Sequence, residues 1–273
     1  MKKLIQILVI LLISTNISAQ LSPSIPTSNT IANLNVADTR NWMAFSNPSN
    51  ISYLKSSGFG FQYENRFLLN ELSTKSVFAN LPTNLVDMAF SASYFGYNQY
   101  NEILIGIGFA RNFSDKFSLG VQFNYSATYF GPEIRYLGVL FPQLGLNLKL
   151  SPKFHLGFST FNPFQQNINS DYSIKRLASV FSLGCEYFFA DNFAFRSQID
   201  KEISSNYKFG AGFDYTMLNF LTVKLGAYTH GYLVPCLGIT SNFGSFSFSY
   251  NADFQPLLGL VSIASVRYNI DKK

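Results

Sequence analysis

Apolar and polar residues alternate along most of this chain. From Phe117 to Tyr129 every odd position is apolar and every even position is small or polar. A period of two places these two sets on opposite faces of a β-strand, whereas a helix would spread the same side chains around its circumference. The pattern recurs in residues 103–109, 144–150, 181–189, 207–215, 221–229 and 246–254. The sequence therefore predicts an all-β protein.

The segments number about fourteen, and an even number of strands suits a closed antiparallel barrel. The predicted strands begin near Phe59, Thr74, Leu85, Ile103, Phe117, Leu144, Phe154, Ala178, Phe193, Tyr207, Leu221, Cys236, Ser245 and Gly259. Short turns are predicted at residues 81–84, 112–115, 151–153, 190–192, 217–219 and 241–244, and longer loops lie between them, notably at residues 131–141 and 162–173. Short connections at one end and long ones at the other are typical of outer-membrane barrels.

Alternation alone does not separate a membrane barrel from a soluble β-sandwich or a lipocalin. Aromatic residues help, because Phe117 and Tyr129 flank an aliphatic band around Val121, as in the girdles of outer-membrane barrels. The opposite face carries Gln122 and Asn124, which are too polar for a dry core. Charged residues make up 13% of the chain, against about 25% in an ordinary soluble domain. These features favour lipid outside and a polar lumen inside.

The first residues predict export. Lys2 and Lys3 precede an apolar run from residue 4 to 13, and Ser18-Ala19 ends a signal peptide predicted over residues 1–19. An uncleaved anchor is the weaker alternative, because a spanning helix needs about 20 apolar residues. Without the two lysines the formal charge falls from +5 to +3 (20 − 2 − 15). The mature chain has no basic cluster, so nucleic-acid binding is not expected.

Residues 20–57 lack the strand pattern and are rich in Asn, Ser, Thr and Pro. A barrel of about fourteen strands, predicted over residues 58–273, is too wide for its own side chains to fill. We therefore expect residues 20–57 to form a hatch in the lumen, with a periplasmic tail as the alternative. Within this segment Asp38 is expected to cap a short helix that carries Trp42 and Phe45 and ends before Asn47-Pro48.

The stretch from Trp42 to Leu54, with Phe45, Asn47 and Pro48, resembles the element that closes the N-terminal hatch of FadL-like barrels and of their PorV/PorQ relatives. Ser49 stands where the usual residue is Ala. Residues 58–67, 96–102 and 109–120 are similar to the family too. The resemblance implies a fourteen-stranded barrel in the outer membrane of a Gram-negative cell, with a hatch in its lumen.

Two functions follow from this resemblance and remain open. FadL-like members carry hydrophobic molecules inward and release them through a lateral opening near the third strand, where this chain has the small residues Ala89, Ser91 and Ser93. PorV/PorQ relatives instead serve the type IX secretion machinery and bind protein partners. The expected partners are therefore outer-membrane lipid with either a hydrophobic solute or secretion-machinery proteins. A gap in the wall beside the third strand would favour transport.

No catalytic motif is present, and no enzyme activity, cofactor or metal is expected. His155 and His230 fall on different strands, and Cys185 and Cys236 read as isolated thiols, with one disulfide as the alternative. Charges expected to face the lumen alternate in sign, so they should pair across strands or hold the hatch. They are Glu64, Asp87, Arg111, Lys149, Glu186, Arg196, Asp200, Glu202, Lys208, Asp214, Lys224 and Arg267.

The register of one hairpin can also be predicted. Apolar residues occupy odd positions in both 207–215 and 221–229, so facing residues must sum to an even number. A three-residue loop from Leu218 to Phe220 gives a sum of 438, which places Asp214 opposite Lys224 on the lumen face.

Overall fold

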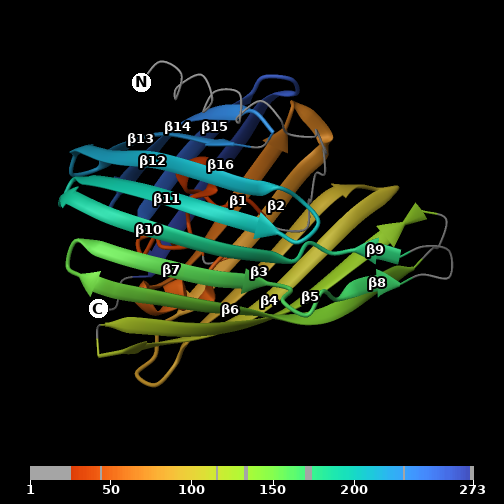
Figure 1. Ribbon diagram of the computed structural model, residues 1–273, viewed down its shortest axis with the longest axis horizontal. Coiled ribbons are helices and arrows are strands. Elements are labelled where there is room, and N and C mark those ends of the chain that lie inside the picture. Colours follow the sequence, from red (N-terminus) through yellow and green to blue (C-terminus); the bar gives the residue numbers. More distant parts are fainter. Residues whose placement is uncertain are drawn as a thin grey trace, which may run out of the picture.

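The chain forms one closed antiparallel barrel of fourteen strands, as the alternation predicted (Figure 1). The computed structural model describes residues 26–43, 45–114, 116–131, 135–169, 174–229 and 231–270. The predicted signal peptide and His230 lie outside these residues. The wall consists of β1 (Ser57–Arg66), β2 (Leu69–Leu81), β3 (Asp87–Tyr97), β4 (Tyr100–Phe113), β5 (Phe117–Phe130), β6 (Tyr136–Ser151), β7 (Phe154–Phe161), β10 (Val180–Ala190), β11 (Phe193–Glu202), β12 (Tyr207–Leu218), β13 (Leu221–Thr229), β14 (Leu233–Phe243), β15 (Phe246–Gln255) and β16 (Gly259–Ile270).

Each wall strand pairs with its neighbours in chain order, and β1 closes the barrel against β16. Two further short strands, β8 (Asn167–Asn169) and β9 (Ile174–Arg176), form a separate hairpin between β7 and β10 that the sequence did not predict. β6 begins at Tyr136 rather than near Leu144, because apolar side chains on both faces hide the alternation: Tyr136 and Leu140 are exposed, while Phe141 points inward and is buried.

The barrel has two distinguishable ends. We call the end where β1 begins and β16 finishes the terminal end, and the opposite end the loop end. Short turns join β4 to β5, β6 to β7 and β10 to β11 at the terminal end, as predicted. The β8–β9 hairpin projects beyond the wall at the loop end (Figure 1).

The two faces of the wall differ as the pattern predicted. On β5, Gln122 and Asn124 are buried on the lumen side, whereas Leu119 and Phe123 are 46% and 48% exposed on the outer side. Exposed aliphatic and aromatic side chains cover the outer face of the other wall strands as well, for example Phe213 and Leu225. Among the described residues, no helix has both the length and the apolar character that a membrane crossing requires.

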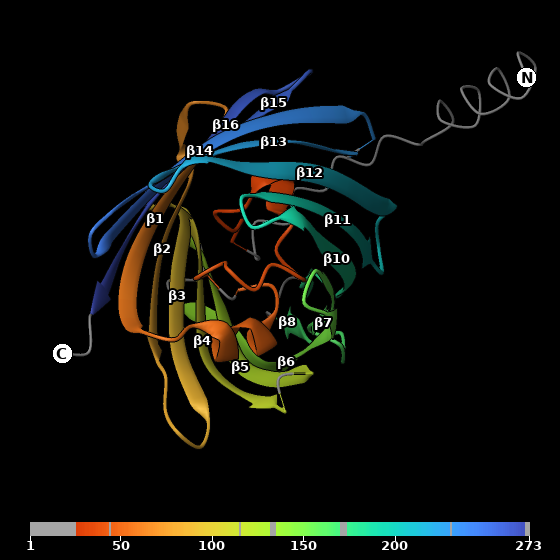
Figure 2. The ribbon, with the colours of Figure 1, turned by 90° about the vertical axis from the view of Figure 1, so that its left-hand side faces the viewer.

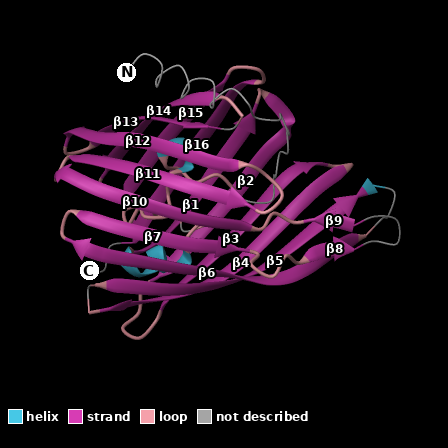
Figure 3. Cartoon of the chain, viewed as in Figure 1, coloured by secondary structure: helices cyan, strands magenta, loops and turns pink. Residues whose placement is uncertain are grey.

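The N-terminal segment, which we define as residues 26–56, lies inside the ring of strands (Figure 2). It contains the two helices of the described residues, the short 3-10 helices η1 (Ile31–Asn33) and η2 (Pro48–Tyr53) (Figure 3). The described residues between Asp38 and Asn47 form no helix, so the prediction of a helix there is wrong. Asp38 instead accepts a hydrogen bond from the Arg40 backbone N–H in a turn, and Asn47-Pro48 begins η2, because Asn caps a helix start and Pro fits its first position.

The predicted register of β12 and β13 is confirmed. Asp214 faces Lys224 and Tyr215 faces Val223, so facing residues sum to 438. The loop length was wrong, because an irregularity between Thr216 and Leu218 brings Leu218 opposite Leu221 and shortens the turn to two residues.

Candidate functional site in the barrel lumen

Apolar side chains of the N-terminal segment pack against one side of the wall. Trp42, Met43, Phe45, Ile51 and Leu54 form one buried cluster with Phe78 of β2, Ala89 of β3 and Ala110 of β4. Trp42 and Phe45 each meet the Phe78 ring edge to face, with ring centroids 6.3 and 6.1 Å apart. The predicted hatch residues Trp42 and Phe45 therefore anchor the segment to β2–β4.

Glycines in the wall let the backbone of the segment approach it. A Cβ at Gly120 of β5 would lie 2.4 Å from the backbone of Pro48 and Ser49. A Cβ at Gly145 of β6 would lie 2.1 Å from Asn47 Oδ1, and a Cβ at Gly157 of β7 would lie 2.2 Å from the Val36 carbonyl oxygen. Only glycine permits contacts this close, so the wall sequence is fitted to the path of the segment.

Side-chain amides of the wall hold the backbone of the segment. Gln143 Nε2 donates to the Phe45 carbonyl at 2.7 Å, and Gln198 Oε1 accepts from the backbone N–H groups of Asn35 and Val36 at 3.0 and 3.1 Å. The hatch residue Asn47 donates from Nδ2 to the Val36 carbonyl at 2.6 Å and to a carbonyl of β6 at 3.3 Å. An irregular buried backbone needs such partners, and the polar lumen supplies them.

A buried ion cluster ties the segment to the wall at mid-lumen. Arg196 of β11 lies 2.8 Å from Glu186 of β10, 2.5 Å from Asp214 of β12 and 3.2 Å from Asp38 of the segment. The predicted charges Arg196 and Asp214 thus come together, but Asp214 bonds to Arg196 and not to the facing Lys224, whose ammonium donates to the Asn29 carbonyl at 3.1 Å. Burial raises the pKa of the Asp38 carboxyl, against the attraction of Arg196.

Two cavities lie on opposite sides of the N-terminal segment. The loop-end cavity, of about 260 Å³, has Thr27, Asn33 and Ser46 of the segment as its floor. The terminal-end cavity, of about 250 Å³, touches other residues of the segment, among them Asp38 and Trp42. Among the described residues none lines both cavities. The segment therefore divides the lumen.

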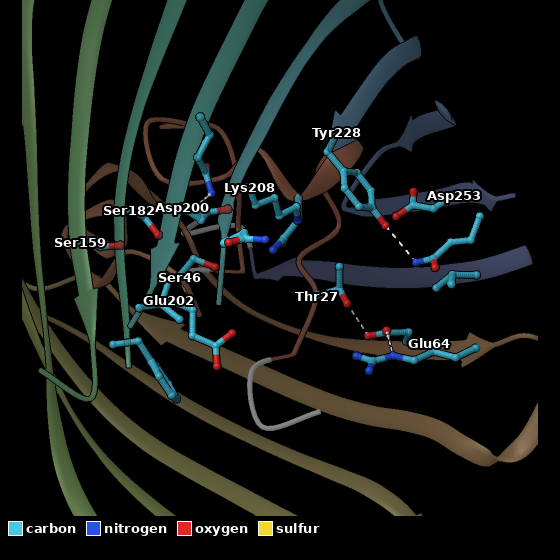
Figure 4. A pocket seen from close by; sticks show the side chains of 18 of the residues that line it. Thr27, Ser46, Glu64, Ser159, Ser182, Asp200, Glu202, Lys208, Tyr228 and Asp253 are labelled. Atoms are coloured by element: carbon cyan, nitrogen blue, oxygen red, sulfur yellow. Dashed lines mark hydrogen bonds and ion pairs between the residues drawn. The ribbon is translucent and has the colours of Figure 1, made fainter. Parts of the chain in front are cut away.

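The loop-end cavity carries four of the predicted lumen charges, Glu64, Asp200, Glu202 and Lys208 (Figure 4). Glu64 accepts from Thr27 Oγ1 at 2.6 Å and from Arg66 Nε at 2.6 Å. Lys208 places its ammonium 4.2 Å from the centroid of the Tyr228 ring. Asp200 and Glu202 of β11 line the same cavity.

The β8–β9 hairpin covers another part of the loop end. Lys175 Nζ lies 2.7 Å from Glu102 Oε1 and donates to Thr128 Oγ1 at 2.8 Å. Ile168 is buried in a cluster with lumen-side residues of β4, β6 and β7. Burial lowers the pKa of the Lys175 ammonium, and Glu102 opposes this shift.

Four further predicted lumen charges lie outside the ion cluster and the loop-end cavity, and one of them, Arg267 of β16, is buried and donates to Asn80 Oδ1 at 3.3 Å. Arg111 is exposed on the outer face and lies 5.6 Å from the Phe113 ring, so its assignment to the lumen is wrong. The even positions of β4 face inward there, and an arginine near a strand end can extend its charged head to water. Asp87 accepts from the Thr83 backbone N–H in the β2–β3 turn, and Lys149 is exposed at the terminal end.

The third strand shows no opening in this structure. β3 pairs with β2 from Met88 to Phe95 and with β4 from Asp87 to Tyr97. The small residues expected at an opening, Ala89, Ser91 and Ser93, are buried on the lumen face, where Ala89 makes room for the Trp42 and Phe45 cluster. The expected opening is therefore not a feature of this state of the barrel.

Solved structures of known proteins share this barrel architecture. No protein-family model and no curated protein matches the sequence. A FadL homologue of Pseudomonas aeruginosa matches the structure with a TM-score of 0.67 and 12% identity, covering 91% of this chain and 99% of that protein. The chain has the FadL-like barrel fold. The monoaromatic hydrocarbon channel CymD matches with a TM-score of 0.66 and 11% identity, covering 93% of this chain and 100% of that one.

A third FadL-like barrel, the toluene transporter TbuX of Ralstonia pickettii, matches with a TM-score of 0.64 and 10% identity, covering 92% of this chain and 98% of that protein. At these identities the likeness concerns the fold. Within it, sequence reasoning missed Asp38 as an ion-pair partner, Gln143 and Gln198 as holders of the segment, and Asp253 in the cavity wall. The inward parity of the three wall residues was visible, but their contacts depend on the path of the segment.

Proposed function

We propose that this chain is an outer-membrane channel that moves small hydrophobic molecules inward. The observation that carries the proposal is the N-terminal segment, held across the lumen between two cavities in a FadL-like barrel. The longest connection, residues 162–179 between β7 and β10, marks the loop end as the outer side, because outer-membrane barrels carry their long connections there. A solute would then enter the loop-end cavity first.

The N-terminal segment acts in this proposal as the hatch. Several of its ties to the wall are single hydrogen bonds, such as those from Gln143 and to Gln198, and net contributions of such bonds are about 0.5–1.5 kcal/mol each. They can be exchanged one after another while the strand ladder stays intact. Passage would require the segment to move away from the wall, because it separates the two cavities.

The test is uptake by whole cells of a Gram-negative host that lacks its own FadL-like barrels. Cells that express this protein should accumulate a labelled monoaromatic compound faster than cells with an empty vector. Planar-bilayer conductance tests the hatch separately: deletion of residues 20–56 should raise it above that of the full-length protein. Unchanged uptake would refute the transport proposal, and unchanged conductance would refute the hatch.

The secretion-machinery alternative gains no support from the comparisons, and we do not propose it. The cleavable signal peptide stays a prediction, since its residues lie outside the described part of the chain.

A further inference from the structure

The loop-end cavity carries an excess of negative charge. Among the described residues, four carboxylates and two cations line it, which gives this part of the lining a net charge of −2 (2 − 4). The floor adds no charge, because Thr27, Asn33 and Ser46 of the N-terminal segment are neutral. The six charged residues are Glu64, Arg66, Asp200, Glu202, Lys208 and Asp253.

Both cations already have partners. Arg66 is bonded to Glu64 at 2.6 Å, and its guanidinium also lies 5.8 Å from the Phe95 ring. Lys208 faces Asp200 in the β11–β12 register and holds its ammonium over the Tyr228 ring. Beside Lys208, the described lining also has Asp253 of β15 and the two β11 carboxylates, of which Asp200 accepts from Gln198 Nε2 at 2.7 Å. A concave site with one dominant sign of charge concentrates ions of the opposite sign.

A second, independent observation points to a ligand with hydrogen-bonding groups. Ser159 of β7 and Ser182 of β10 face each other in register, are 3% and 8% exposed, and point into the cavity (Figure 4). Neither hydroxyl has a hydrogen-bond partner among the described residues. Both hydroxyl oxygens are open to the cavity, so they can bond to a group that enters it.

The same cavity also offers apolar surface. Phe67, Phe161, Val180 and Val261 line it beside the polar groups. Its volume of about 260 Å³ lies just below the range of about 300–1,000 Å³ found for drug-sized ligands. The site therefore fits a small molecule with an apolar body and a polar, positively charged head.

We propose that the loop-end cavity is a binding site for small organic cations, such as protonated amines that carry a phenyl or alkyl body. This inference rests on the proposed channel function and narrows its substrate class. The carboxylates of β11, above all Asp200, attract the ammonium of the ligand. The two serine hydroxyls accept hydrogen bonds from its N–H groups or bond to a neighbouring hydroxyl of the ligand. The aromatic and aliphatic side chains of the cavity pack against its apolar body.

Three probes with the same ring test the charge requirement: 2-phenylethylamine, 2-phenylethanol and phenylacetate. In the whole-cell uptake assay at pH 7, the amine should enter about tenfold faster than the alcohol, and the anion slowest. Equilibrium dialysis of the full-length protein should show the same order of affinity. High salt should reduce the preference for the amine, because the attraction is electrostatic.

Asp200→Asn should weaken binding of the amine at least about threefold and leave binding of the alcohol unchanged. Asp191→Asn is the matched control, since Asp191 is exposed in the turn at the terminal end. An alcohol that binds and enters as well as the amine, or an unchanged Asp200→Asn variant, would overturn the inference while the channel stands. Uptake of none of the three probes would instead overturn the channel.

Discussion

Replacing Gly157 by alanine should push the N-terminal segment away from the barrel wall. The new Cβ would lie 2.2 Å from the Val36 carbonyl oxygen and 2.8 Å from Ala37 Cα, both backbone atoms that cannot rotate aside. Overpacking of this kind costs about 1–3 kcal/mol. Displacement at Val36 also strains its hydrogen bonds to Gln198 and Asn47.

The barrel provides a control directly across the ladder. Gly184 of β10 pairs with Gly157 and faces the same lumen, but a Cβ there would lie 3.4 Å from its nearest neighbours, an ordinary contact distance. Both variants change the unfolded chain in the same way, so this contribution cancels between them. The comparison therefore isolates the clash with the segment.

Planar-bilayer recordings measure the result. Because 1.4 kcal/mol corresponds to a tenfold change in an equilibrium, Gly157→Ala should raise the open population on the order of tenfold to a hundredfold. Gly184→Ala should leave it at the level of the unchanged protein. Equal conductance for the two variants, with equal unfolding free energies in urea, would mean that the segment does not close the lumen along this path.

Three further predictions concern the wall and the ion cluster. Phe213→Arg should destabilise the barrel in lipid vesicles by about 2–4 kcal/mol and Phe213→Leu by much less, because Phe213 lies on the outer face. Equal urea unfolding curves for the two variants would mean that this face does not contact lipid. Arg196→Met should lower the unfolding free energy by about 3–5 kcal/mol, since it leaves the carboxylates of Asp38, Glu186 and Asp214 without their shared cation. Arg111→Met, at an exposed arginine, is the control. A smaller loss for Arg196→Met than for Arg111→Met would show that the ion cluster does not stabilise the barrel. A double-mutant cycle should find stronger coupling between Arg196 and Asp214 than between Asp214 and Lys224, and the reverse order would restore the cross-strand pair as the main contact.

The period-two pattern predicted the wall well, because side-chain direction in a strand is fixed by position alone. It gave the strand number, the inward set Gln122 and Asn124, and the register that puts Asp214 opposite Lys224. The same rule places Arg111 outside with Ile105 and Ile107. Register does not determine which long side chain a charge contacts: Asp214 faces Lys224, as predicted, but bonds to Arg196.

The conformation of the N-terminal segment could not be predicted from local sequence patterns, for a physical reason. Its backbone is irregular, and its shape is fixed by groups about 100 or more residues away, such as Gln143 bonded to the Phe45 carbonyl and Gln198 bonded to Val36. Propensity and capping rules favoured a helix after Asp38, but the buried ion pair with Arg196 and the wall amides offer that stretch better partners. Tertiary contacts therefore override the local preference.

The inward glycines of the wall are the sequence feature that indicates where the N-terminal segment contacts the barrel. A glycine inside a strand weakens the strand, so inward glycines on successive strands need a compensating contact. Gly120, Gly145 and Gly157 lie on β5, β6 and β7; the first two contact residues 47–49 of the segment and the third contacts Val36 and Ala37. Their parity marks them as inward in the sequence, and their succession follows the segment along the wall. The barrel and the segment are thus specified together: removal of the segment would leave these strands with the cost of glycine and without the contact that offsets it.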